Sequence, residues 1–113
     1  MTAEAAAATD VRTALVTAPD PETGERIART LLEESLVACV NLVPGVVSLY
    51  RWEGEVQRDQ EVLMVLKTTA GRAEAVRARV VEEHPYDVPE VLVLPVVAGH
   101  PAYLNWVRDE VGG

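Results

Sequence analysis

ACVNLVPGVVSLYRW (Ala38 to Trp52) and EVQRDQEVLMVLKT (Glu55 to Thr68) are two long apolar runs that follow one another along the chain. Both are rich in valine and leucine, and β-branched residues favour strands. The Glu53-Gly54 pair between them is typical of a tight hairpin turn. Pro44-Gly45 interrupts the first run and suits a bulge better than continuous pairing. We therefore predict one long β-hairpin.

Shorter elements flank this hairpin on both sides. Asp20 can cap a helix that begins with Pro21, since a proline there loses no hydrogen bond. Thr69 can cap a second helix, and Pro85 ends it. The expected elements are a strand over Arg12 to Thr17, a helix over Glu22 to Ser35, the hairpin, a helix over Gly71 to Glu83, a strand over Glu90 to Val97, and a short helix that carries Tyr103, Leu104, Trp106 and Val107.

This order of elements predicts an α+β fold, the ferredoxin-like βαββαβ sandwich. In that fold, two helices cover one face of a four-stranded antiparallel sheet. The chain has 113 residues, a length that suits one domain. We expect residues 11–113 to form that domain. Residues 1–10, MTAEAAAATD, lack the features of an export signal, and we expect them to form a disordered tail.

The predicted strands are apolar on both faces, which is unusual for a sheet with one face in water. Val62, Met64 and Leu66 point to one side, whereas Leu63 and Val65 point to the other. Two helices can cover only one side, and each exposed aliphatic side chain would forfeit about 1.5 to 3 kcal/mol. We therefore infer a homo-oligomer in which sheets pack together. The alternative is that the strands are shorter than predicted.

The composition limits the classes of partner. Lys and Arg number 10 against 18 acidic residues, and the formal net charge is −8. This charge opposes binding to nucleic acid and to anionic membranes. No apolar run approaches the roughly 20 residues that cross a bilayer. The single cysteine, Cys39, forms no internal disulfide and suits a reducing cytoplasm.

Two residues are candidate metal ligands. His84, in the stretch EHPYDVPE, could bind a cation together with the oxygen donors of Glu83, Asp87 and Glu90. A histidine in the last turn of a helix is also favoured by the helix dipole and can bond to free carbonyls there. Cys39 could bind Cu(I) through its thiolate, but a small, buried strand residue is the simpler interpretation.

Other polar and aromatic residues predict a cleft between subunits. Its candidate residues are Tyr50, Trp52, Glu61, Lys67, Tyr86 and Glu90. Packing at an interface with a wet polar edge is the alternative role for these side chains. Asp20 is expected at the same end of the sheet as His84, so a mixed carboxylate and imidazole site is conceivable there. No nucleophile motif, glycine-rich phosphate loop or CxxC pair is present, so we predict that the protein is not an enzyme.

Several separated segments of the chain resemble the CutA family, the divalent-cation tolerance proteins. They are ACVNLVPGVVSLYRWEGEV at 38–56, DQEVLMVLKT at 59–68, HPYDVPEVLVLPV at 84–96 and YLNWV at 103–107. The resemblance implies a trimer of ferredoxin-like subunits, similar in architecture to PII signalling proteins. It also implies association with copper and other divalent cations, no required cofactor and no enzyme activity.

Some members of this family have been considered copper binders through a first-strand cysteine and two adjacent histidines. This chain keeps only His84 of that set, with Val16 at the cysteine position and Glu83 at the other histidine position. The leading hypothesis is a non-enzymatic trimer involved in divalent-metal tolerance or response, with weak cation binding. The alternatives are a PII-like or ACT-like regulator with a small molecule in the cleft, or a structural scaffold for an unknown protein partner.

Overall fold

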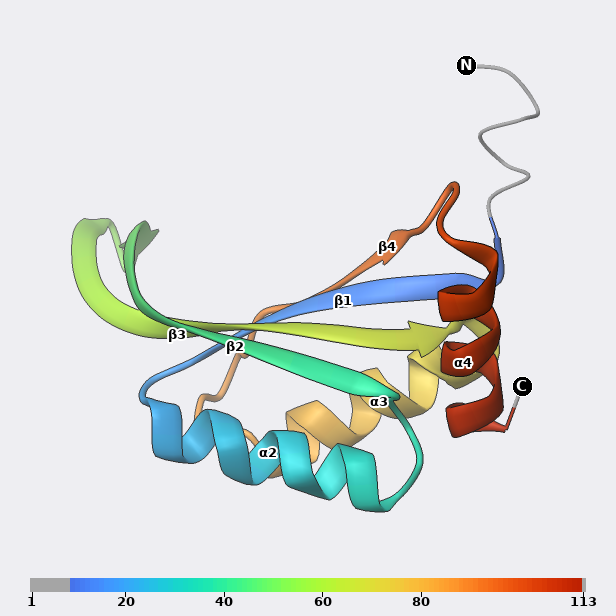
Figure 1. Cartoon of the computed structure of the whole chain (residues 1–113). Helices are drawn as coiled ribbons and strands as arrows, with labels where there is room; N and C mark the ends of the chain where they lie inside the picture. The colour runs from blue at the N-terminus through green and yellow to red at the C-terminus, as the bar shows by residue number, and fades with distance from the viewer. Residues whose placement is uncertain (1–8, 113) are drawn as a thin grey trace.

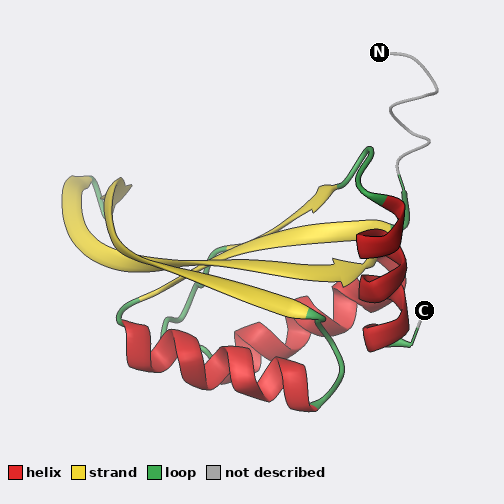
Figure 2. Cartoon of the chain, viewed as in Figure 1, coloured by secondary structure: helices red, strands yellow, loops and turns green. Residues whose placement is uncertain are grey.

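The computed structural model describes residues 9–112 and shows a four-stranded antiparallel sheet with two helices packed on one face and a third at the end of the sheet (Figure 1). Figure 2 shows the two layers in separate colours. The elements are β1 (Val11–Ala18), α2 (Pro21–Glu33), β2 (Cys39–Trp52), β3 (Glu55–Thr69), α3 (Ala70–Glu83), β4 (Val91–Pro95) and α4 (Pro101–Val111). The strand order is β2-β3-β1-β4, so the predicted ferredoxin-like fold is confirmed.

The start and the end of α2 show why local sequence fixes its position. The Asp20 carboxylate accepts a hydrogen bond of 2.7 Å from the backbone N–H of Thr23, and Pro21 occupies the first turn. After the helix, Ser35 adopts a positive φ of 56°, and the Leu36 N–H donates to the Leu31 carbonyl. This left-handed residue closes the helix two residues before the predicted end.

The hydrophobic core lies between the helix layer and one face of the sheet. Alternate strand residues supply the sheet side of this core, because successive side chains of a strand point to opposite faces. Its fully buried members include Val16, Met64 and Leu66 from the strands and Ile27 and Leu31 from α2. The helix α4 packs separately against the end of the sheet, where Leu104 and Val107 contact Val11.

The opposite face of the sheet is also apolar, and this chain leaves much of it uncovered. The β1–β4 register places Leu92 beside Leu15 and Leu94 beside Thr13, on the face away from the helices. Leu92 is 54% exposed and Leu94 is 40% exposed. We call this surface the open face. The sequence prediction of strands that are apolar on both sides is thus confirmed.

The hairpin extends well beyond the rest of the sheet and curls away from the helix layer (Figure 1). Its turn is at Glu53 and Gly54, which have φ values of 51° and 81°. The pairing between β2 and β3 shifts between Val43 and Val46, and Gly45 in this bulge has a φ of 74°. The predicted turn and bulge are both present.

Other predicted boundaries also differ from the structure, most of them by one residue. The last strand ends at Pro95 rather than Val97. The Val96 N–H still donates to the Val11 carbonyl, but the Val11 N–H donates to the Thr9 hydroxyl instead of continuing the ladder. The predicted tail, residues 1–10, lies mostly outside the described residues. Thr9 and Asp10 nevertheless belong to the folded part: the Thr9 N–H donates to Val96 and the Asp10 carbonyl accepts from Ala70. Across residues 9–112, no helix has the length and hydropathy that a membrane span requires.

Candidate functional site

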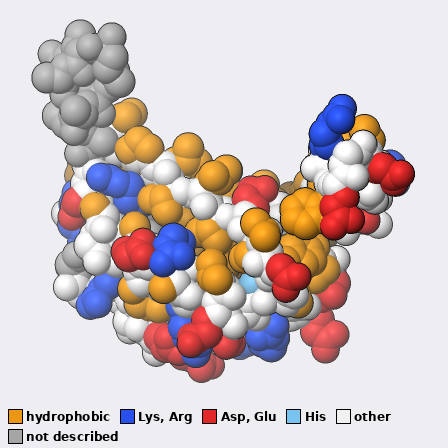
Figure 3. Space-filling model, turned by 180° about the vertical axis from the view of Figure 1, so that it is seen from behind, with side chains coloured by type: hydrophobic (Ala, Val, Ile, Leu, Met, Phe, Trp, Pro, Cys, Tyr) orange, Lys and Arg blue, Asp and Glu red, His pale blue; other side chains and the backbone are white. Residues whose placement is uncertain are grey.

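A cleft of about 680 Å³ lies between the curled hairpin and the loop that follows α3. In the space-filling view, hydrophobic and acidic side chains meet at the base of the hairpin (Figure 3). Strand residues line one wall, and the segment from Tyr86 to Glu90 lines the other. This cleft lies within one chain, and five of the residues predicted for a cleft between subunits line it: Tyr50, Trp52, Glu61, Tyr86 and Glu90.

On the hairpin wall, a tyrosine and an acid from the two arms are paired. The Tyr50 hydroxyl donates a hydrogen bond to the Asp59 carboxylate. Asp59 lies opposite Ser48 in the register, which makes it a diagonal neighbour of Tyr50 on the same face. This hydrogen bond raises the pKa of Tyr50 above its ordinary value, so the phenol stays protonated.

On the loop wall, a second phenol and a second acid are paired. The Tyr86 hydroxyl donates to Glu61 Oε2 at 2.9 Å. Glu61 is only 8% exposed, although it belongs to the hairpin strand β3. Burial, and then the hydrogen bond to Glu61, raise the pKa of Tyr86. This pair therefore joins the loop after α3 to the sheet through a protonated phenol and a carboxyl group.

His84 lies behind this wall and holds Tyr86 in place. It is 8% exposed, its Nε2 lies 2.7 Å from the Thr17 carbonyl, and its Nδ1 lies 3.1 Å from the backbone nitrogen of Tyr86. A carbonyl only accepts and an amide N–H only donates, so these partners fix the neutral tautomer with the proton on Nε2. The imidazole also packs against the Tyr86 ring, with centroids 4.6 Å apart. Both ring nitrogens thus have hydrogen-bond partners.

The predicted bond between His84 and free helix carbonyls takes a different form. The backbone N–H of His84 donates to the Val80 carbonyl and closes α3, as a helix cap does. Its side chain instead reaches across to β1. The acid before it, Glu83, pairs with Arg26 at 3.4 Å and Arg79 at 3.1 Å in the helix layer. Glu83 is therefore engaged away from the cleft.

Cys39 and Lys67 lie at the other end of the sheet. They are opposite each other in β2 and β3, and Lys67 is in turn opposite Thr13. Lys67 Nζ lies 3.9 Å from the Cys39 Sγ and donates to the Asn41 side chain. Lys67 is six residues from Glu61 along β3, which corresponds to about 20 Å. Lys67 therefore does not line the cleft within this chain, and Cys39 does not meet His84 within one chain.

The remaining candidate ligands do not converge. Within residues 9–112, no three His, Cys, Asp or Glu side chains are grouped closely enough to hold a metal ion. Asp20 caps α2, and its pKa is lowered first by the backbone N–H of Thr23. Asp59 lines the cleft although no sequence motif indicates it, and Asp87, a predicted oxygen donor to a metal at His84, lines the cleft as well. The hairpin register could have revealed Asp59, because counting back from the turn places it opposite Ser48.

The fold and this cleft define a small ferredoxin-like α+β protein. The family model described as CutA1 divalent ion tolerance protein matches residues 12–110. The chain therefore belongs to the CutA1 divalent ion tolerance protein family. It is 48% identical over 98 residues to a divalent-cation tolerance protein CutA of Thermus thermophilus, covering 87% of this chain and 95% of that protein.

Other known proteins show the same likeness. The chain is 45% identical to the human protein CutA over 88% of its own length, but it spans only 55% of that longer protein. Among solved structures, CutA from Xylella fastidiosa is similar with a TM-score of 0.89 and 40% identity, covering 91% of this chain and 99% of that chain. The Thermus thermophilus structure has a TM-score of 0.88 and 46% identity, covering 90% and 99% of the two chains.

Proposed function

We propose that this protein is a non-enzymatic homotrimer that serves in the tolerance of divalent metal ions, including copper, and binds cations weakly. Membership of the family supports the role in metal tolerance. The open face is the observation that carries the assembly. On the evidence of its single cysteine, we also propose that the protein works in the cytoplasm.

The open face supports the trimer because exposing its apolar side chains to water costs free energy. Leu92 and Leu94 on β4 and Val43 on β2 are each 40% exposed or more, and they lie on the same side of the sheet, at its two edges. Covering such side chains gains about 25 cal/mol per Å² of apolar surface. A second and a third copy, which present the same face, supply that cover. The resemblance to CutA proteins is what favours three copies over two.

The surroundings of the two candidate ligands support weak rather than tight metal binding. A metal ion on His84 would have to replace the Thr17 or the Tyr86 hydrogen bond, so binding would cost an existing contact. A cation on Cys39 would approach the positive charge of Lys67. The net charge of −8 attracts cations to the protein without selecting among them.

Calorimetry with Cu(I), Cu(II), Zn(II) and Ni(II) tests the metal proposal. We expect weak binding to the wild type that is reduced in His84→Ala for Cu(II) and in Cys39→Ser for Cu(I). The control is His100→Ala, which removes the other histidine of the chain. The same heat of binding in the wild type and all three variants would show that neither His84 nor Cys39 is a metal ligand. The absence of any binding would overturn the metal proposal.

A second candidate function is a PII-like regulator that holds a small molecule in the cleft. The volume of about 680 Å³ favours it, because ligand sites fall in the range of roughly 300 to 1,000 Å³. A thermal-shift screen of metabolites tests it, with Trp52→Ala as the cleft variant. A metabolite that stabilises the wild type but not Trp52→Ala would support this function. A screen in which nothing stabilises the wild type would exclude it.

A further inference from the structure

We propose that the cleft under the hairpin binds an organic ammonium cation of the polyamine class, held by carboxylates and by the faces of aromatic rings. This inference rests on the second candidate function above, and it names the chemistry of the ligand. The family name concerns divalent metal ions, whereas the side chains of this cleft suit a larger cation.

The charge of the cleft is uniformly negative. Asp59, Glu61, Asp87 and Glu90 all line it, and among the described lining residues none is lysine, arginine or histidine. A concave surface with charge of one sign raises the local concentration of counter-ions. Anionic metabolites such as nucleotides would be repelled, because no cation is present there to pair with a phosphate. The charge thus selects a cationic ligand.

The aromatic rings add a preference for an organic cation. Tyr50, Trp52 and Tyr86 line the cleft and are 41%, 51% and 37% exposed. The face of an aromatic ring attracts an ammonium group within about 6 Å of its centre, and tryptophan is the strongest of these partners. The methylene chain of a polyamine would pack against the apolar side chains of Val47 and Leu49, which also line the cleft.

The two acid–phenol pairs set the geometry of the binding groups. Tyr50 donates to Asp59 and Tyr86 donates to Glu61, so each hydroxyl is turned toward a carboxylate. A carboxylate has about four lone-pair sites, so one hydrogen bond leaves it able to accept from an ammonium N–H. Because both phenols remain donors, they add no negative charge of their own. The acids are thereby held beside the rings.

A bare divalent ion fits this arrangement less well. The acids are spread along both walls of the cleft, and in the part of the chain that the structure describes no three of them are grouped as metal ligands. Mg²⁺ and Ca²⁺ need several oxygen ligands within about 2.0 to 2.6 Å. A polyamine carries its charges several ångströms apart, so separate ammonium groups can meet separate carboxylates. The spacing of the acids therefore favours the organic ligand.

The fluorescence of Trp52 tests the proposal directly. The chain has two tryptophans, so Trp106→Phe leaves Trp52 as the only one. Spermidine is titrated into this protein at constant ionic strength. We expect a saturable change in emission, and we expect Glu61→Gln, which keeps the shape of the side chain and removes its charge, to weaken the affinity by about tenfold.

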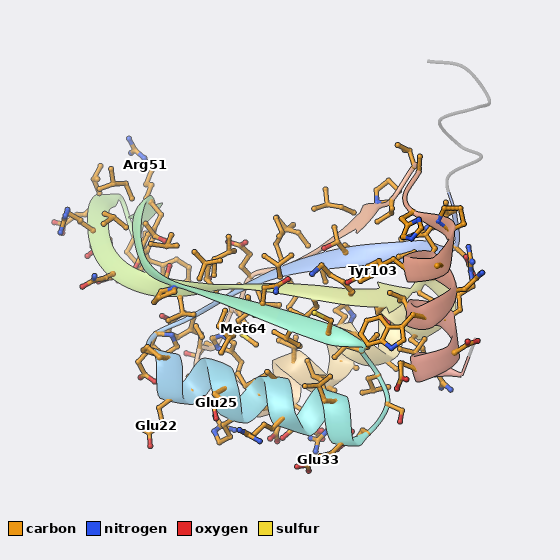
Figure 4. The ribbon with its side chains drawn as sticks, viewed as in Figure 1. Glu22, Glu25, Glu33, Arg51, Met64 and Tyr103 are labelled. Carbon is orange, nitrogen blue, oxygen red and sulfur yellow. The ribbon has the colours of Figure 1, made fainter. Side chains whose placement is uncertain are left out.

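The matched control is Glu33→Gln, which removes the same charge on the helix layer, away from the cleft (Figure 4). We expect it to change the spermidine affinity by less than about twofold, because salt screens distant surface charges. Asp59→Asn is a second cleft variant in case Glu61→Gln does not fold. Equal weakening by the cleft and control variants would show non-specific attraction and overturn the proposal. Displacement of spermidine by an equal concentration of Mg²⁺ would also overturn it.

The two proposals for the cleft fail in different ways. If spermidine does not bind but a neutral or anionic metabolite stabilises the protein in a Trp52-dependent manner, the ligand class is wrong and the regulatory function stands. If no small molecule binds, both are wrong.

Discussion

The two faces of the sheet are built from the same kinds of residue but differ in what covers them. Met64 and Leu66 point toward α2 and α3 and are fully buried. Leu92 is 54% exposed on the opposite face, although its chemistry is the same as that of Leu66. Burial is therefore decided by the layers that the chain supplies: α2 and α3 cover one face, whereas α4 packs only at the end of the sheet. The open face shows what the subunit lacks when it is alone.

The largest loss of stability is expected from a substitution in the core, on the face of the sheet that the helices cover. Leu66→Ala removes a fully buried side chain from the core between the sheet and the helices. Such a substitution costs about 2 to 5 kcal/mol of unfolding free energy, because it loses transfer energy and leaves a cavity. Urea denaturation at a fixed protein concentration measures it. The control, Leu32→Ala, truncates a side chain of α2 that is 41% exposed, and we expect it to cost less than about 1 kcal/mol.

If Leu66→Ala cost no more than Leu32→Ala, the core would not lie where the structure places it.

On the open face, we expect a change of assembly rather than of fold. Leu92→Asp places a charge on the exposed side of β4, where an isolated subunit can solvate it but a packed interface cannot. Light scattering should report a single chain with a wild-type circular dichroism spectrum. Leu32→Asp is the matched control on α2 and should leave the assembly intact. An assembled Leu92→Asp protein would show that this face is not the interface.

Much of the fold could be predicted because its signals are local. Asp20 and Pro21 start α2, Glu53 and Gly54 form the turn, and Pro85 follows the end of α3. Each of these residues acts on its own backbone or on a neighbour within a few positions. The predicted end of β4 is too late because a run of apolar residues continues past Pro95, whereas the ladder stops where the Val11 N–H donates to the Thr9 hydroxyl.

The site could be predicted only in part because its contacts are long-range. His84 bonds to Thr17, which lies 67 positions away, and no local pattern indicates that partner. Lys67, also predicted as a cleft residue, shares a strand and a face with Glu61, but distance along the strand separates the two. Asp59 was missed because its pairing follows from the register of the hairpin rather than from its immediate neighbours.

A smaller loss of stability is expected from substitution of His84, which links the end of α3 to β1 and to the loop wall of the cleft. His84→Ala leaves the Thr17 carbonyl and the Tyr86 N–H without their side-chain partner. An unpaired buried polar group costs about 1 to 3 kcal/mol. Urea denaturation measures the loss, and His100→Ala, which changes an exposed histidine with no side-chain cap bond, is expected to cost less than about 0.5 kcal/mol. Equal stability of the two variants would mean that the His84 contacts do not hold the loop.

The smallest effect on stability is expected at the turn from β1 into α2. There, the Asp20 carboxylate caps the start of α2, one of the helices that cover the core face of the sheet. The pKa of Asp20 is lowered from its ordinary value of 3.8, first by the backbone N–H of Thr23. A lowered folded-state pKa stabilises the fold above the unfolded value, and this contribution is lost as the pH falls through the folded-state pKa. Asp20→Asn keeps a cap acceptor but does not titrate.

At about pH 7, the wild type should therefore unfold at a higher urea concentration than Asp20→Asn. This difference in urea midpoint should shrink as the pH approaches about 3. If the difference between the two proteins stayed constant across this range, the ionised cap would contribute nothing to the covered face. In that case, packing of Ile27 and Leu31 alone would hold α2 on the sheet.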